Sequence, residues 1–410
     1  MKSLRIAKKK PTQDTGRKPA PGERKAMRKR IVLSNTNALE VPGLRDLEAS
    51  AIGDAEFENQ VMGIPGPVVD QLRAVEAFKT NQGWGLFRRP AALMRRDAIE
   101  LSKAIRSIQA ENKTTLRRVI TGERASGKTT LLLQAMSMAF MKEWVVVNFP
   151  DAKELVINHT AYDHAPGTNP PQYVQKDYTA QLLRQISTAN EAVLDKMKLS
   201  QKHNLPIPVP EDITLRAFAE LGAKDRDSSW QFLQALWKEL IKPGGPPIMV
   251  CMDNLSYIMG NSKYTDRDFK PIHSHDLLLV RHFTDLLSGN TKLPNGGMVL
   301  AATSGSCSPK SEAMEFAIKA KEAQQTPGAE VPQWNPYLAR DERSYNSLRD
   351  AEVQRLRGLT REEARGIMEY YAASGMMRRV VDENLVSEKW TISSGGIIGE
   401  LERSTVKYRI

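Results

Sequence analysis

The chain has 410 residues, of which 40% are hydrophobic, so it is long enough to bury a full core, and we expect two domains with tails. No window approaches eighteen uninterrupted apolar residues, so no membrane-spanning helix is predicted, and no short apolar segment near the start predicts a secretory signal. Cys251 and Cys307 are too few for a disulfide framework, and we expect buried thiols in a reducing compartment.

The net charge of +11 is concentrated in an N-terminal arm. Residues 1–30 hold twelve Lys or Arg against Asp14 and Glu23, whereas the rest of the chain holds 47 basic and 46 acidic residues. Such a polar segment does not bury enough apolar surface to fold alone, so we expect a disordered arm that lies on RNA. The alternatives are an organelle-targeting segment, a nuclear localisation signal and a solvated tail without a partner.

Residues 31–111 are expected to form an extended segment followed by a helical region. Pro and Gly residues interrupt any long periodicity up to about residue 67. Beyond it, apolar residues at helical spacing predict one helix over 68–78 and another over 91–111.

A phosphate-binding loop is predicted at Gly122 to Thr130, written GERASGKTT, between an apolar strand at 117–121 and an apolar helix. Gly122-x4-Gly127-Lys128-Thr129 fits the pattern in which backbone N–H groups and a helix N-terminus surround an anion. Lys128 would then reach the β- and γ-phosphates, and Thr129 would bind Mg²⁺. The alternative is a Gly-rich turn without a ligand.

Two later strands follow, and the second of them is predicted to end at a metal ligand. The strand at 144–149 ends before Asp151, a candidate cap for the next helix, and a polar insertion over 158–210 follows with one helix at about 174–199. The apolar run at 247–252 ends in Asp253, which would bind Mg²⁺ opposite Thr129. The next residue is Asn254, and an amide does not take a proton from an attacking water, so hydrolysis is expected to be very slow.

A further strand at 297–302 follows a helix at 275–287 and ends at Thr303 and Ser304, which are expected to contact the γ-phosphate or the water, with a strand-end cap as the alternative. The Asn-Lys-x-Asp pattern that reads guanine is absent, so these residues do not identify the base.

The isolated His residues lack partners at metal-ligand spacing and are interpreted as structural. Beyond the Pro-rich stretch, the capping box at Thr360 and Glu363 predicts a helix.

These predictions together give an α/β fold, a parallel sheet of the P-loop NTPase type with helices on both faces and a small C-terminal helical lid domain. The expected divisions are the basic arm 1–30, the N-terminal region 31–111, the nucleotide-binding domain 112–323 with its insertion 158–210, a Pro-rich linker 324–340, and the lid and tail 341–410. No catalytic residue is assigned. The residues expected to bind the nucleotide are Gly122, Glu123, Arg124, Ala125, Ser126, Gly127, Lys128, Thr129, Thr130, Asp253, Asn254, Thr303 and Ser304, with Thr129 and Asp253 as metal ligands.

The order and spacing of these motifs resemble the death-associated protein three family, which are GTP-binding, ring-type ATPase-like proteins of the mitochondrial small ribosomal subunit. The matching segments are GERASGKT, the strand from Trp144 to Asp151, MVCMDNL with HDLLLVRHFTDLL and GGMVLAATSGS, and LTREEARGIMEYYAASGMM. They cover roughly residues 84–380. The arm and the insertion match less closely. Members of the family also lack a Glu after the metal-binding Asp, and in this chain that position is Asn254.

The resemblance implies a structural role in the head of the mitochondrial small subunit, with ribosomal RNA, neighbouring ribosomal proteins and the large subunit as partners. It also implies a bound GTP or GDP with Mg²⁺, although ATP fits the same residues. An active NTPase that switches a partner is the first alternative. A basic nucleic-acid-binding ATPase outside the ribosome is the second.

Overall fold

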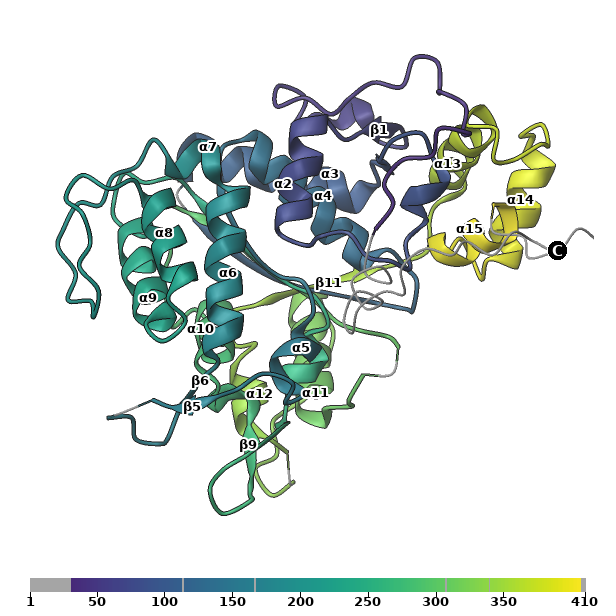
Figure 1. The fold of residues 1–410 in the computed structure, drawn as a ribbon. Coiled ribbons are helices and arrows are strands. Elements are labelled where there is room, and N and C mark those ends of the chain that lie inside the picture. Colours follow the sequence, from purple (N-terminus) through teal and green to yellow (C-terminus); the bar gives the residue numbers. More distant parts are fainter. Residues whose placement is uncertain (1–30, 113, 166, 307, 339, 407–410) are drawn as a thin grey trace, which may run out of the picture.

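The computed structural model describes residues 31–112, 114–165, 167–306, 308–338 and 340–406 (Figure 1). The expected basic arm and Cys307 lie outside these ranges. The centre of the structure is a parallel sheet in the order β11-β3-β10-β7-β4. Its strands are β3 (Thr115–Gly122), β4 (Val145–Phe149), β7 (Ile248–Met252), β10 (Gly297–Ala302) and β11 (Glu352–Leu356).

Helices cover both faces of the sheet because both faces are apolar. Along β7, Ile248 and Val250 pack into one hydrophobic cluster and Met249 and Cys251 into the opposite one. A parallel strand of this kind is stable only between two layers of helices. One layer is α2 (Gly66–Ala74), α3 (Arg96–Ser107) and α4 (Lys128–Met141); the other contains α5 (Ala152–Val156), α6 (Lys176–Ala189), α7 (Glu191–Leu194), α8 (Leu215–Lys224), α9 (Ser229–Leu240), α10 (Leu278–Leu287), α11 (Glu312–Gln325) and α12 (Glu342–Asn346).

The helix expected over 91–111 begins later than predicted. Ala91–Leu93 is the strand β2, which pairs antiparallel with β1 (Val61–Gly63). The helix α3 starts only at Arg96, and a π-helical turn, Ile108–Asn112, follows it. Three residues are too few to show a periodicity, so pairing with a distant strand decided their conformation.

The insertion contains a broken helix where a single one was expected. The break lies at Asn190, between α6 and α7, and its side chain is 1% exposed. The Asn190 amide accepts from Val146 N at 2.7 Å and donates to Val146 O at 2.9 Å. Because β4 is an edge strand, Asn190 satisfies backbone groups that would otherwise be left unpaired. Two short hairpins flank this layer: β5 (Asp163–His164) with β6 (Tyr173–Val174), and β8 (Asn261–Thr265) with β9 (Pro271–His273).

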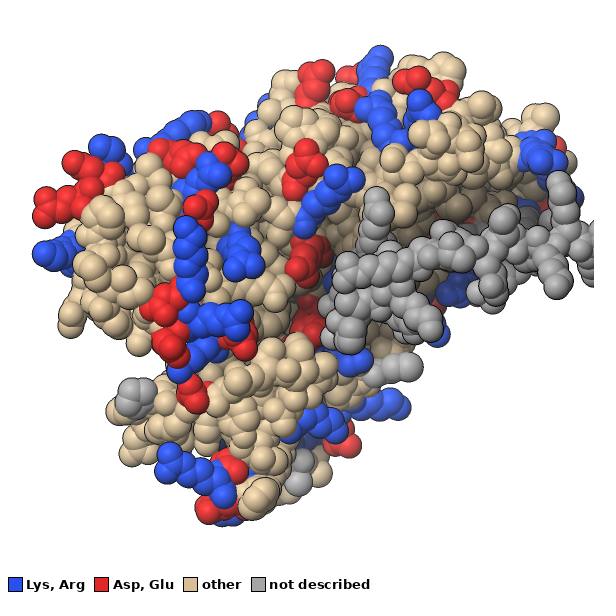
Figure 2. All heavy atoms as spheres, in the orientation of Figure 1, with Lys and Arg blue, Asp and Glu red and all other residues tan. Residues whose placement is uncertain are grey.

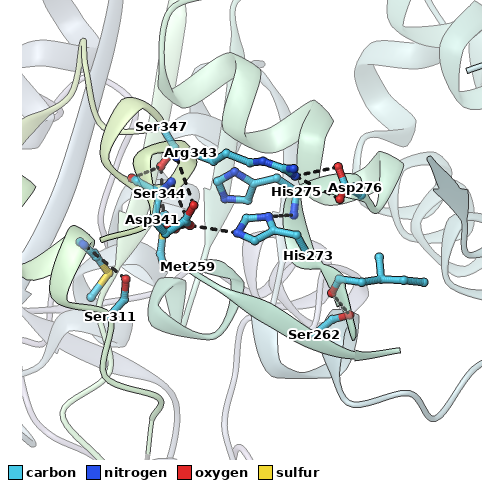
Figure 3. A network of polar contacts seen from close by, with 12 residues as sticks. Met259, Ser262, His273, His275, Asp276, Ser311, Asp341, Arg343, Ser344 and Ser347 are labelled. Atoms are coloured by element: carbon cyan, nitrogen blue, oxygen red, sulfur yellow. Dashed lines mark hydrogen bonds and ion pairs between the residues drawn. The ribbon is translucent and has the colours of Figure 1, made fainter. Parts of the chain in front are cut away.

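The segment expected to form only the lid and tail also supplies the edge strand β11, beside β3. Figure 3 shows how the chain is held where it leaves the Pro-rich linker: His273 Nε2 lies 2.9 Å from Asp341 Oδ2, and Arg343 contacts Asp276 at 2.9 Å. These contacts fasten α12 to the end of the β8–β9 hairpin. The chain then enters the sheet before it reaches the last helices.

The last helices form a separate cluster, here called the C-terminal helical cluster: α13 (Arg361–Ala373), α14 (Glu383–Ile392) and α15 (Ile398–Thr405). They enclose their own hydrophobic core, which Phe87 and Leu93 complete. The predicted capping box is confirmed, since Thr360 accepts from Glu363 N and Glu363 accepts from Thr360 N. Over the described residues, no helix is long and apolar enough to cross a membrane.

Candidate phosphate-binding site

The predicted phosphate loop joins the end of β3 to the start of α4. Its backbone turns through positive φ at Gly122 (143°), Ala125 (61°) and Gly127 (96°). A Cβ on Gly122 would lie 2.6 Å from Leu356 O, so only glycine fits beside β11 at this point. The turn aligns the start of α4, where unpaired N–H groups accumulate, with the cavity described below.

Lys128 folds back into its own loop. The side chain is 8% exposed, and Nζ donates to Gly122 O at 2.9 Å and to Glu123 O at 2.6 Å. Burial lowers the pKa of Lys128 from its ordinary value, while the charges of Asp253 and Glu123 partly offset that effect. The ammonium group is therefore held under the loop by neutral carbonyl groups, and an anion above the loop would be a stronger partner.

The two predicted metal ligands lie in direct contact. Thr129 Oγ1 donates to Asp253 Oδ2 at 2.8 Å, and Asn254 N donates to Asp253 Oδ1 at 2.9 Å. Burial raises the pKa of Asp253 from its ordinary value. A hydroxyl beside a buried carboxylate is a pair of hard oxygen ligands, which fits Mg²⁺. Among the described residues, no group of three or more His, Cys, Asp or Glu side chains could hold a metal, so such an ion would complete its shell from water and phosphate oxygens.

Asn254 connects this pair to a residue that the sequence analysis treated only as a helix cap. Its backbone has a positive φ of 63°, and Nδ2 donates to Asp151 Oδ1 at 2.8 Å. Asp151 also accepts from Lys153 N at 3.0 Å, which confirms the predicted cap of α5. Lys79 lies nearby and donates to Pro150 O. Asp151 and Lys79 come from segments that are separate from each other and from the motifs, so no local pattern marked them as part of the site.

Thr303 and Ser304 lie at the end of β10, as expected. Thr303 Oγ1 points to Ile120 O at 3.4 Å, and Ser304 Oγ donates to Ser306 O at 3.3 Å. Both residues line the cavity, with Thr303 also bound through its backbone N to Ile120 O at 3.0 Å. The strand-end contacts and a contact with a ligand are therefore both compatible with their positions.

A cavity of about 640 Å³ brings the predicted residues together. This volume lies within the usual range for small-molecule sites. Arg124 to Thr130, Asp253, Asn254, Thr303 and Ser304 line it, whereas Gly122 and Glu123, at the start of the loop, contribute carbonyl groups to Lys128. The rest of its wall consists of the segment before β2 and the C-terminal helical cluster, with the side chains Trp84, Phe87, Ile367, Tyr370, Tyr371 and Ile398.

The C-terminal helical cluster contacts the phosphate loop directly. Gly399 N, in α15, donates to Ala125 O at 3.0 Å. Arg95, 6% exposed, donates to Ser126 O at 2.9 Å and to Arg357 O at 2.8 Å, and so joins the loop to the chain that leaves β11. The loop is therefore hydrogen-bonded to α15 and, through Arg95, connected to the segment that follows β11.

Comparison with known proteins identifies the family. The sequence model described as mitochondrial ribosomal death-associated protein 3 matches residues 92–404. The chain belongs to this family. The site residues therefore lie in the matched part, and the family and the mitochondrial location predicted from the sequence are confirmed.

Two relatives are both named small ribosomal subunit protein mS29. The chain is 46% identical to the small ribosomal subunit protein mS29 of Neurospora crassa over 97% of this chain and 85% of that protein. It is 22% identical to the mS29 protein of Bos taurus over 53% of this chain and 55% of that protein. Among solved structures, a chain of closed-state Hsp104 with ATPγS and FITC casein aligns over 75% of this chain and 43% of that chain, at 12% identity and a TM-score of 0.31. A likeness this low does not establish the fold.

Proposed function

We propose that the chain is a structural protein of the mitochondrial small ribosomal subunit that holds a purine nucleotide with Mg²⁺. The main support for a bound nucleotide is the contact between Thr129 and Asp253. It lies beside a loop that contains Lys128 and whose backbone turns through positive φ angles. The sequence motif predicted these partners 124 residues apart, and the fold brings them within 2.8 Å. A fold of the P-loop NTPase type is the simplest account of that arrangement.

The lining of the cavity gives the nucleotide an orientation. Its polar end contains Lys128, Thr129, Asp151 and Asp253, which suits phosphate groups and their metal ion. Its other wall contains Trp84 and Tyr370 with aliphatic side chains, which suits an aromatic base and its ribose. GTP or GDP is the ligand that the family resemblance implies, and ATP would satisfy the same contacts.

The C-terminal helical cluster would act as a lid on this nucleotide. Ile398, Glu402 and Arg403 in α15 line the cavity, and Gly399 is hydrogen-bonded to the phosphate loop. A ligand that contacts both the loop and α15 stabilises the folded state by mass action. The nucleotide would therefore hold the sheet and the lid together as one unit, which is what a static ribosomal component requires.

Ribosomal RNA and neighbouring ribosomal proteins are the proposed partners, in keeping with the names of the two mS29 relatives. The visible face of the body mixes both signs of charge, with Lys and Arg interspersed among Asp and Glu (Figure 2). RNA attraction is assigned to the arm, because residues 1–30 hold twelve basic against two acidic residues, whereas the rest of the chain holds 47 and 46. Contacts with the large subunit rest on the family resemblance alone.

Sedimentation distinguishes this proposal from an NTPase that switches a free partner. Chain that is a structural component migrates with the small subunit through a salt-washed gradient. Chain that stays in the soluble fractions, and associates with subunits only during turnover, would favour the switch. Calorimetric titration of the purified chain with GTP, GDP and ATP, with and without Mg²⁺, then tests the nucleotide site itself.

A further inference from the structure

Asp151 occupies a place in the cavity that its role as a helix cap does not explain. The chain places it directly after Pro150, at the end of β4, and β4 pairs with β7, which ends one residue before Asp253. Ala152 N donates to Asp253 O at 3.0 Å, so the two carboxylate-bearing segments are bound to each other at the same edge of the sheet. Asp151 contributes to the rise in the pKa of Asp253, after the larger effect of burial.

Asn254 holds the Asp151 carboxylate by one oxygen only. The side-chain amide of Asn254 donates to Asp151 Oδ1, which also accepts from Lys153 N. The backbone N of Asn254 donates to Asp253 Oδ1. One residue thus bridges the two carboxylates. Among the described residues, none donates a hydrogen bond to Asp151 Oδ2. That oxygen therefore retains its capacity to accept a proton or to orient a water molecule.

We propose that Asp151 is the catalytic base of a slow hydrolysis of a nucleoside triphosphate, with Asn254 as its positioning residue. The proposal rests on the proposed nucleotide site and adds an activity to it. The residue after Asp253 is Asn254, not a carboxylate, and the fold brings a carboxylate, Asp151, from the end of the neighbouring strand β4. Asn254 then has a reason to be an amide, since a second carboxylate at that position would repel Asp151 where the amide donates to it.

Atoms and electrons balance in the proposed step. A water oxygen forms a bond to the γ-phosphorus, and the bond between that phosphorus and the β–γ bridging oxygen breaks, with its electron pair leaving on the nucleoside diphosphate. The water proton passes to Asp151 Oδ2 and later to the released phosphate. Thr129 and Asp253 would hold the Mg²⁺ that offsets the charge on the leaving group, and Lys128 would contact the phosphates. The other oxygen of Asp151 stays bound to Lys153 N and to the Asn254 amide, which hold the carboxylate in place during the step.

Asp151→Asn tests the proposal without removing the cap, since asparagine caps helices as well as aspartate does. Asp151→Ser keeps a capping oxygen and also lacks the carboxylate. Asp382→Asn is the matched control, because Asp382 caps α14 through Leu385 N at 2.8 Å and lies outside the cavity. The purified full-length chains are compared in single-turnover hydrolysis of GTP and ATP with Mg²⁺.

Both Asp151 variants should lose at least about a hundredfold in rate, the usual contribution of a general base, while the control keeps the wild-type rate. A second measurement does not depend on turnover: calorimetry with nucleoside diphosphate and aluminium fluoride, which mimics the transferring phosphoryl group and its water. Relative to its affinity for a non-hydrolysable triphosphate, Asp151→Asn should bind this complex at least about tenfold more weakly than the wild-type chain does.

Three outcomes overturn the inference while leaving the nucleotide site intact. They are a wild-type chain that binds nucleotide without hydrolysing it, Asp151 variants that hydrolyse at the wild-type rate, and an unchanged affinity for the aluminium fluoride complex. A wild-type chain that binds no nucleotide would instead overturn the proposed function itself.

Discussion

Replacement of Lys128 by alanine should weaken nucleotide binding far more than it changes the fold. In the described structure, Nζ is held by two carbonyl groups, at 2.9 and 2.6 Å, distances typical of charge-assisted hydrogen bonds. Phosphate oxygens would replace these neutral partners when a nucleotide binds. A hydrogen bond to a charged group contributes about 1.5–3 kcal/mol, which corresponds to roughly a 10- to 150-fold loss of affinity for a triphosphate.

The effect on stability without nucleotide should be modest, about 1–3 kcal/mol, because two carbonyl groups lose this donor while a buried charge is also removed. The assay is calorimetric titration with a non-hydrolysable triphosphate and Mg²⁺, together with thermal unfolding of the nucleotide-free chain. Lys142→Ala, which lies just beyond the other end of the same helix, is the control. Equal affinities for the triphosphate in Lys128→Ala and in wild type would refute the assignment of the phosphate loop.

Other predictions concern the metal, the arm and two partly buried histidines. Thr129→Ala should remove most of the Mg²⁺ dependence of nucleotide binding, and an unchanged Mg²⁺ titration would contradict the metal pair. Deletion of residues 1–30 should weaken RNA binding and flatten its salt dependence by about 0.7–0.9 in log–log slope for each phosphate that the arm neutralises, measured by filter binding at several salt concentrations. Burial lowers the pKa of His275 to about 3 and that of His282 to about 4, so the folded state binds fewer protons than the unfolded state below pH 6.5. The free energy of unfolding should therefore fall as the pH decreases from about 6.5, by up to about 1.4 kcal/mol per pH unit for each histidine, and urea unfolding of His282→Phe should show a shallower dependence.

The sequence predicted the parts of the site whose residues are close together in the chain. The phosphate loop, the strand before it and the helix after it form one local pattern, in which each residue type has a physical reason. The acid at the end of β7 was recognised because a buried parallel strand is a continuous apolar run. The capping box of α13 is another local signal, and the structure confirms it.

The features that the sequence did not predict depend on contacts between distant segments. The strand β2 forms by pairing with β1. The helix breaks at Asn190, where the side-chain amide is hydrogen-bonded to the backbone N and O of Val146 in the edge strand β4. The strand β11 is five residues long, and its exposed residues, Glu352 and Arg355, do not alternate with the buried ones, so its pattern does not separate it from a loop. Asp151 was interpreted as a cap, and only the position of Asn254 relates it to the site.

The most direct test of the account is to identify what the native assembly holds. Small subunits that contain the chain are isolated through a salt-washed gradient and denatured, and the released nucleotide is identified by chromatography and mass spectrometry. Subunits with the Lys128→Ala chain are treated in parallel. The account predicts a purine nucleotide in an amount equal to the wild-type chain, and a much smaller amount from the variant. Subunits that contain the wild-type chain yet release no more purine nucleotide than the variant subunits would contradict it.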